Sequence, residues 1–312
     1  MLDVYADAAK DMLALPMVKG VKTATERFAG ADETFTIEAL MQNGWALQSG
    51  TSHFLGQNFA RAFDVYFQNT KEERELVWAT SWGVSTRLMG ALVMTHADDA
   101  GLRLPPAVAP HQVVIVPITK GPGPDTELVD IAVDEIVSNL KKAGVRVKVD
   151  DRAGMRPGAK YFEWERKGVP VRLEVGPRDV KQNVAVMALR TGGDKAQVPM
   201  GRGLTARVQE ALQTVHEDLW AQASQRLAEG TIPCSRYDEM RAHLSSGERA
   251  RLGLYLVPWA DDADNEKTIQ EETKASIRCY PLDLNGEGAC EGKTCFYSGK
   301  PATHMALFAR AF

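Results

Sequence analysis

The sequence predicts a multidomain protein of the α+β and α/β classes, and three patterns carry this prediction. Residues 1–104 contain closely spaced strand-like stretches with short links, which is typical of an antiparallel sheet. Residues 105–205 alternate strands with helices, which favours an α/β domain with a mixed, mostly parallel sheet. Residues 206–312 open with a long amphipathic helix that leads into a small α/β carboxy-terminal domain.

The composition is that of an ordinary globular protein. Of the 312 residues, 44% are hydrophobic and 25% are charged, which is enough core for two or three domains. The formal net charge of -4 argues against indiscriminate nucleic-acid binding, but it leaves room for a local basic site. No apolar run is as long as a membrane span, and acidic residues come early, unlike in a signal or transit peptide. We therefore expect a cytoplasmic protein without a membrane partner.

In the first block, hydrophobic periodicity predicts a helix over Val4–Leu15. A polar stretch over 22–40 follows, in which no element is expected. Stretches rich in β-favouring residues then predict strands over Trp45–Gln48, Asp64–Gln68 and Leu76–Trp82.

The second block begins after a proline-rich linker that starts at Leu104. Its expected elements are a strand over Gln112–Ile118, a helix over about Thr126–Ala143, a strand over 145–151, a helix over Ala159–Lys167, and strands over 169–175 and 183–190. A helix over about Leu204–Ala228 connects this block to the third, which ends in a strand-like stretch over 305–312.

One arginine stands at the opening of an apolar helix-like run in the first block. Gly83 permits a turn after the strand that ends at Trp82, and Ser85 or Thr86 can cap a helix that continues to Met94. This helix is apolar on nearly every side, so we expect it to be buried nearly all round. Because the positive end of the helix dipole disfavours a cation, Arg87 suggests that an anion such as phosphate belongs there. A salt bridge to a neighbouring acid is the alternative.

Two further groups of polar residues can carry chemistry. Gln48, Thr51 and His53 surround the flexible Gly50, which suits a small polar ligand; a strand end with a structural histidine is the alternative. In the second block, a mixed set of side chains can donate to and accept from base edges, with ordinary surface ion pairs as the alternative. This set is Glu165, Arg172, Arg178 and Asp179.

Four stretches resemble prolyl-tRNA synthetase of the archaeal and eukaryotic-like type, a class II synthetase. They are "LQSGTSHFLGQNFARAFDVYFQ", "TSWGVSTRLMGAL", "LPPAVAPHQVVIVPI" and "GVPVRLEVGPRD", in the family's order and spacing. The resemblance implies that residues 1–104 are the carboxy-terminal half of a class II catalytic domain with motif 3. It also implies that residues 105–205 are an anticodon-binding domain, and that residues 206–312 are a zinc-domain-like module with its linker helix.

The resemblance also implies roles for individual residues. ATP contacts fall on Gln48, Thr51, Ser85 and Arg87, the proline pocket on His53, Trp82 and Gly83, and anticodon contacts on Glu165, Arg172, Arg178 and Asp179. In this family, ATP with Mg²⁺ activates proline to prolyl-adenylate, and the prolyl group then passes to the terminal ribose of tRNA(Pro). The implied partners are therefore proline, ATP and tRNA(Pro).

Two departures from the family pattern qualify these expectations. Motif 1, which is the family's main homodimer contact, and motif 2 find no match in the sequence, so we expect a fragment or half of a split enzyme that is inactive without them. A non-catalytic tRNA-binding or regulatory paralogue is the alternative. The zinc cysteines are also degraded: "PWADDADNEK" holds no cysteine where the first pair would fall, and only Cys295 remains of the second. Cys234, Cys279 and Cys290 do not restore paired spacing, so zinc is not expected.

Overall fold

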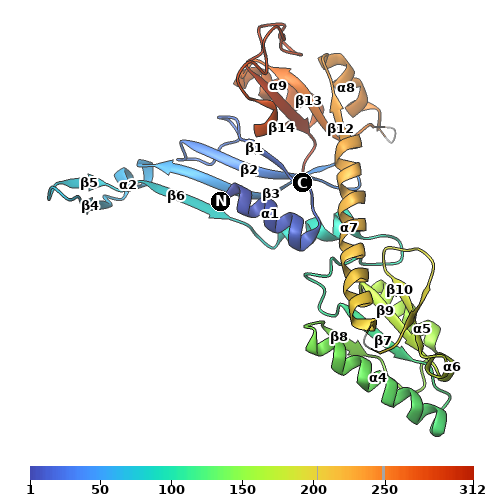
Figure 1. The fold of residues 1–312 in the computed structure, drawn as a ribbon. Helices are drawn as coiled ribbons and strands as arrows, with labels where there is room; N and C mark the ends of the chain where they lie inside the picture. Colours follow the sequence, from blue (N-terminus) through green and yellow to red (C-terminus); the bar gives the residue numbers. More distant parts are fainter. Residues whose placement is uncertain (202, 248–249) are drawn as a thin grey trace. The chain divides into compact units, whose positions relative to one another are not determined.

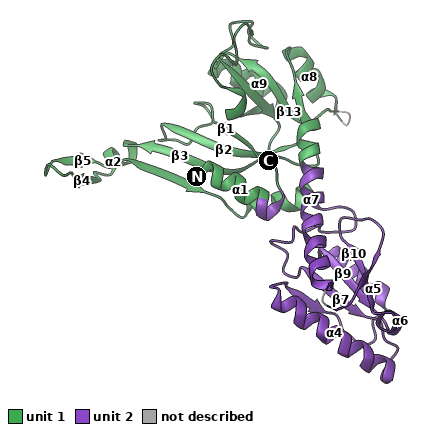
Figure 2. Cartoon of the chain, in the orientation of Figure 1, with its two compact units in different colours: residues 1–10, 15–95, 224–312 green, residues 11–14, 96–223 purple. Residues whose placement is uncertain are grey.

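The computed structural model describes residues 1–201, 203–247 and 250–312 (Figure 1). The chain forms two compact units, shown in different colours in Figure 2. Unit 1 comprises residues 1–10, 15–95 and 224–312, and unit 2 comprises residues 11–14 and 96–223. The mixed α/β multidomain class predicted from the sequence is confirmed, whereas the domain limits at 104/105 and 205/206 stay predictions.

Unit 1 is built on an eight-stranded sheet with the order β12-β13-β15-β14-β1-β2-β3-β6. All neighbouring strands in it pair antiparallel except β12 and β13. In chain order the strands are β1 (Val18–Val21), β2 (Glu33–Leu40), β3 (Ala46–Gly56), β6 (Ala79–Gly83), β12 (Thr231–Pro233), β13 (Leu254–Trp259), β14 (Ser276–Pro281) and β15 (His304–Ala309). The helices of this part of the chain are α1 (Leu2–Leu13), α2 (Asn58–Ala62), α3 (Arg87–His96), α8 (Tyr237–Ser245), α9 (Ala263–Thr273) and the 3-10 helix η2 (Leu282–Leu284).

The amino- and carboxy-terminal segments of unit 1 share this one sheet because β1 pairs with β14. Gly20 makes the close approach possible: a Cβ atom added there would lie 2.4 Å from the Cβ of Cys279. On the carboxy-terminal side the core contains the fully buried Tyr255, Trp259 and Phe308. The amino- and carboxy-terminal segments, which end at Thr95 and begin at Ser224, are therefore joined by backbone pairing as well as by side-chain packing.

The expectation of no element over 22–40 is wrong, because this stretch contains β2. Hydrophobic patterns do not reveal this strand, because its buried positions include Thr34, Thr36 and Glu38. Glu38, which is fully buried, pairs with Lys22 at 3.0 Å and with Arg278 of β14 at 3.1 Å. Buried polar and charged groups that satisfy one another thus replace the apolar residues that usually mark such a strand.

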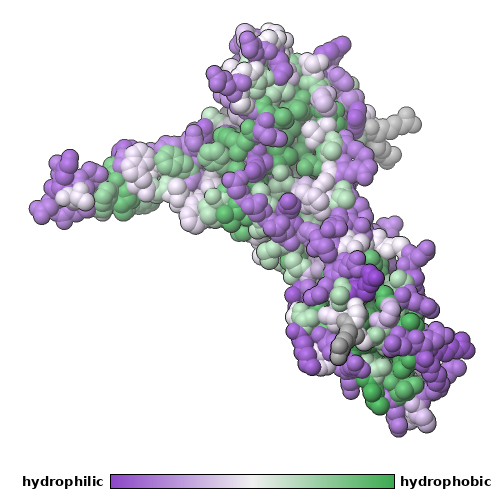
Figure 3. Space-filling view, in the orientation of Figure 1, coloured by the Kyte–Doolittle hydropathy of each residue, from purple (hydrophilic) through white to green (hydrophobic). Residues whose placement is uncertain are grey.

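A small hairpin extends from the first part of unit 1. It consists of β4 (Tyr66–Gln68) and β5 (Arg74–Leu76), which pair antiparallel after α2. Hydrophobic surface is exposed along this arm (Figure 3), where Phe63 is 71% exposed and Phe67 is 44% exposed.

Unit 2 contains a five-stranded mixed sheet with the order β11-β10-β9-β7-β8. Strand β7 pairs parallel with β8 and β9, whereas β9 with β10 and β10 with β11 pair antiparallel. The strands are β7 (Val113–Pro117), β8 (Val147–Val149), β9 (Val171–Val175), β10 (Val184–Leu189) and β11 (Ala196–Pro199), and the helices are α4 (Pro124–Lys142), α5 (Pro157–Arg166) and α6 (Pro177–Lys181). The apolar runs of β7 and β9 are buried in the core, as parallel strands between helices require.

Helix α7 (Leu204–Gly230) contributes to both units, to unit 2 up to Ala223 and to unit 1 from Ser224 onward. Neither this 27-residue helix nor any other helix in the described part of the chain is long and apolar enough to cross a bilayer.

Candidate functional site

Three predicted site residues of β3 lie on one face of the sheet. Their cross-strand partners on β2 are Glu38 for Gln48, Thr36 for Thr51 and Thr34 for His53. Because these partners alternate along β2, they share a face, and so do Gln48, Thr51 and His53. The register shifts at Ser49, which has no partner of its own. Without that extra residue Gln48 would point to the opposite face, so the irregularity gathers the three side chains.

His53 is hydrogen-bonded and lies beside an aromatic ring. Its Nδ1 lies 3.0 Å from the Thr34 hydroxyl oxygen, and its ring centroid lies 4.8 Å from that of Phe28. Burial lowers the pKa of His53 below its ordinary value, which favours the uncharged ring near pH 7. The Phe28 backbone N–H also donates to the Thr34 hydroxyl. Phe28 was missed from the sequence, where it is one of two phenylalanines in the polar stretch over 22–40.

Arg87 begins α3 near the end of this polar face. Its backbone N–H donates to the Ser85 hydroxyl at 3.3 Å, which agrees with the predicted capping role of Ser85. Its Nη1 donates to the backbone carbonyl of Gln48, also at 3.3 Å. Within the described part of the chain no carboxylate pairs with Arg87, so the structure gives no support to the salt-bridge alternative. The exposed guanidinium keeps donors available for an anion.

Trp82 and Gly83 lie on β6 beside β3, but they belong to opposite faces of the sheet. Gly83 is the cross-strand partner of Thr51, whereas Trp82 is the partner of Ser52. Since neighbouring residues of a strand face opposite ways, the structure does not bring Trp82 to the face that holds His53. Gly83 has open space where a Cβ atom would stand, which leaves room next to Thr51.

The expectation that the helix after Arg87 is buried nearly all round is wrong. Ala91 and Leu92 of α3 are buried, but Met89 is 70% exposed and Val93 is 41% exposed. An apolar helix is buried all round only when other elements pack against every side of it. Within the described chain, other elements pack against only one side of α3.

In unit 2, Glu165 and Arg172 line a cavity of about 200 Å³ next to β9 and β10. Trp164, Arg190 and Lys195 line it as well. Lys195 was missed from the sequence because it lies in the β10–β11 connection, where no local pattern marks it. The cavity combines cations, a carboxylate and an aromatic ring, which are the groups that read a base edge or stack on a base.

Arg178 and Asp179 lie on α6 and do not line this cavity. The Asp179 carboxylate accepts a hydrogen bond from the Gly176 backbone N–H at 2.8 Å and so stabilises the start of α6. Arg178 is exposed, and the structure records no ion pair for it among the described residues. Of the two, Arg178 therefore has the freer side chain for contact with a ligand.

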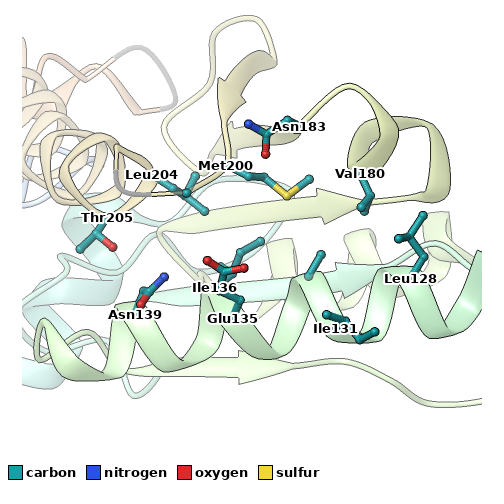
Figure 4. Close-up of a pocket in the computed structure, with 12 residues that line it drawn as sticks. Leu128, Ile131, Glu135, Ile136, Asn139, Val180, Asn183, Met200, Leu204 and Thr205 are labelled. Atoms are coloured by element: carbon teal, nitrogen blue, oxygen red, sulfur yellow. The ribbon is translucent and has the colours of Figure 1, made fainter.

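A second cavity of unit 2, of about 240 Å³, lies between α4, α6 and the residues that flank β11 (Figure 4). Leu128, Ile131, Val180 and Met200 give it a mostly apolar lining, and Glu135 is its ionisable residue within the described chain. Since this lining offers no cation, it lacks the chemistry that attracts a phosphate backbone.

No metal site is evident in residues 1–201, 203–247 and 250–312, where no group of three or more His, Cys, Asp or Glu side chains could hold an ion. Burial raises the pKa of the Cys234 and Cys279 thiols, which disfavours the thiolate form that binds zinc. The described residues therefore offer no ligand set that fits zinc or a protein-held Mg²⁺.

The degraded cysteine pattern leads to a prediction about metal content. We expect purified protein to contain well under one zinc per chain and to unfold at the same urea concentration with and without a chelator, because no thiolate set stabilises the fold. Elemental analysis and urea titration with and without EDTA measure this. One zinc per chain, lost together with stability on chelation, would contradict the prediction.

Comparisons with known proteins first define the broad class. The family model described as "Anticodon binding domain" matches residues 112–210, so the chain is a protein with an anticodon-binding domain. The model "Prolyl-tRNA synthetase, C-terminal" matches residues 237–312. Proline--tRNA ligases of Bacteroides fragilis and Flavobacterium johnsoniae are each 48% identical to the chain over all of its length. The chain belongs to the prolyl-tRNA synthetase family.

The structural comparison agrees with this family. A crystal structure of prolyl-tRNA synthetase from Cryptosporidium parvum, complexed with L-proline and AMP, has a TM-score of 0.91 and 38% sequence identity. The alignment covers 100% of this chain and 65% of that one. The chain likewise spans 61% of the length of the two bacterial relatives.

Proposed function

We propose that this chain works in a prolyl-tRNA synthetase, in which ATP activates proline and the prolyl group is transferred to tRNA(Pro). The observation that carries the proposal is the shared face of Gln48, Thr51 and His53, with Arg87 donating to the Gln48 carbonyl beside it. Such a face suits a compact ligand that has both a polar part and an anionic part. A neutral imidazole next to Phe28 suits the apolar ring of proline, and a guanidinium suits phosphate.

The chemistry assigned to these residues is binding and orientation. Arg87 would stabilise the negative charge on the ATP phosphates while the proline carboxylate attacks the α-phosphorus and pyrophosphate leaves, which yields prolyl-adenylate. The polar strand face would hold both reactants in place. None of these side chains is proposed as a nucleophile or as a general base. The reaction is therefore promoted by position and electrostatics rather than by covalent catalysis.

Unit 2 is proposed to read the proline anticodon. The cavity lined by Glu165 and Arg172, of about 200 Å³, has room for a nucleobase and offers a planar guanidinium, which can bind the O6 and N7 atoms of guanine together. Arg178 of α6, which does not line the cavity, would add a separate contact to the RNA. The negative total charge of the protein makes this local group of cations more important for RNA binding.

The test is proline-dependent exchange of pyrophosphate into ATP, followed by aminoacylation of tRNA(Pro). Because the relatives are longer than this chain, the assay compares the chain alone with the chain fused to the additional segment of the Bacteroides fragilis relative. Exchange in either preparation supports the synthetase. Specific tRNA(Pro) binding without exchange in both would instead favour a non-catalytic tRNA-binding paralogue.

Arg178 provides a direct test of RNA recognition. We expect Arg178→Ala to weaken binding of tRNA(Pro) by about 1 to 3 kcal/mol. Arg178 is exposed and has no ion-pair partner among the described residues, so the variant should lose a base contact without loss of stability. Filter binding at low salt measures the change. Arg207→Ala, which removes an exposed arginine of α7 paired with Glu210, is the matched control and should bind normally. Unchanged binding by Arg178→Ala would contradict the assignment.

A further inference from the structure

One buried carboxylate connects the cations of the unit 2 cavity. Glu174 of β9 is only 6% exposed, although the cavity lies beside it. Its Oε1 accepts hydrogen bonds from Arg172 Nε at 3.1 Å and from Lys195 Nζ at 2.7 Å, and its Oε2 lies 3.1 Å from the same Nζ. The Glu174 carboxylate therefore holds two cations, one from β9 and one from the connection between β10 and β11.

An aromatic ring supports the same two cations. Arg172 Cζ lies 4.4 Å and Lys195 Nζ lies 5.1 Å from the centroid of the Tyr161 ring, within the range of cation–π attraction. Burial and the nearby Glu174 carboxylate raise the pKa of Tyr161, which keeps its hydroxyl protonated. The two cations are thus held between a carboxylate and a ring face.

The Nη groups of Arg172 remain available to bind a ligand. Arg172 pairs with Glu174 through Nε, and among the described residues no hydrogen bond is recorded for its Nη groups. Those groups are the ones that can grip the edge of a guanine. A guanidinium that is already held in place loses less conformational freedom when the base arrives, so the arrangement favours affinity and selectivity.

We infer that Glu174 is a positioning residue for anticodon recognition, which orients Arg172 and Lys195 toward the base without touching the RNA itself. This inference rests on the proposed function of the cavity as the anticodon reader. A positioning role for Glu174 predicts a change in RNA selectivity that a purely structural role does not predict. Neutralising Glu174 adds one positive charge to the site, which strengthens general attraction to phosphate while it loosens the two cations.

The test uses the full chain and two anticodon stem-loop RNAs, one with guanines at the second and third anticodon positions and one with adenines there. For Glu174→Gln, we expect the affinity ratio of the guanine to the adenine stem-loop to fall on the order of tenfold. Affinity for the adenine stem-loop should stay constant or rise. Glu135→Gln, which makes the same charge change in the apolar cavity between α4 and α6, should leave the ratio unchanged.

A second variant covers the case in which Glu174→Gln does not fold. Glu174→Asp keeps the charge but shortens the side chain, so the ratio should fall while affinity for the adenine stem-loop stays constant. If a folded variant keeps the wild-type ratio, or loses affinity for both RNAs equally, the inference is overturned. If wild-type protein itself does not prefer the guanine stem-loop, the proposed anticodon-reading function fails, and the inference fails with it.

Discussion

Glu38→Ala is expected to lower the free energy of unfolding of unit 1 by about 3 to 5 kcal/mol, because it leaves two buried cations without a counter-charge. The side chains of Lys22 and Arg278 are 1% and 8% exposed, and both pair with Glu38. Thr36 also donates to its Oε1 at 3.0 Å. Since Lys22 and Arg278 come from segments that are far apart in the sequence, the loss should affect the pairing of β1, β2 and β14 together.

Urea titration measures the loss in free energy of unfolding, and amide hydrogen exchange of the folded protein locates it within unit 1. Exchange of the amides in β1, β2 and β14 should become faster, while those of β7 and β9 in unit 2 should be protected as in the wild type. Asp3→Ala removes the exposed partner of Lys19 and is the matched control, which should unfold at nearly the same urea concentration as the wild type because exposed ion pairs contribute little.

A triple variant distinguishes a missing counter-charge from a packing defect. Replacing Lys22, Glu38 and Arg278 together by methionine removes all three charges and should restore most of the lost stability, because an apolar set of similar volume needs no pairing. The interpretation would be wrong if Glu38→Ala unfolds within about 1 kcal/mol of the wild type, the level of an exposed pair.

Hydrophobic patterns predict most elements of unit 2, though not α6 and β11, because an apolar cluster forms the main core of its sheet. The helix expected over 126–143 is α4 (Pro124–Lys142), and the strand expected over 169–175 contains β9 (Val171–Val175). In unit 1 the same reasoning missed β2, since one of its faces buries Thr34, Thr36 and Glu38 in place of apolar residues. Its stability depends on partners such as Arg278, which lies 240 residues away in sequence and cannot be identified from local pattern.

The candidate site could be predicted where it is local and not where it depends on strand pairing. Gln48, Thr51 and His53 stand within six residues of one strand, so their proximity follows from the sequence. The position of Trp82 on the other face follows only from the register of β6 against β3. The role of Glu174 likewise cannot be predicted from the sequence, in which it resembles an ordinary surface acid of a strand. Its contact with Lys195 is known only from the structure.

Arg87→Ala is expected to lower proline-dependent pyrophosphate exchange on the order of 100-fold or more in a preparation in which the wild type is active, as removal of one preorganised electrostatic stabiliser commonly does. Arg87→Lys should recover only part of the rate, because an ammonium lacks the planar fork that binds two phosphate oxygens. Thermal stability should hardly change, since Arg87 is exposed and its side chain contacts the Gln48 carbonyl rather than a buried acid.

Melting temperature and exchange rate, measured on the same preparation, separate this role from a structural one. An arginine that only supported the fold would lower the melting temperature on mutation and leave the exchange rate of the folded fraction nearly intact. Arg61→Ala, which removes another exposed arginine from α2, is the matched control and should keep the wild-type exchange rate. A folded Arg87→Ala protein with exchange within about threefold of the wild type would end the assignment of Arg87 to ATP phosphate, because a lost phosphate contact costs far more.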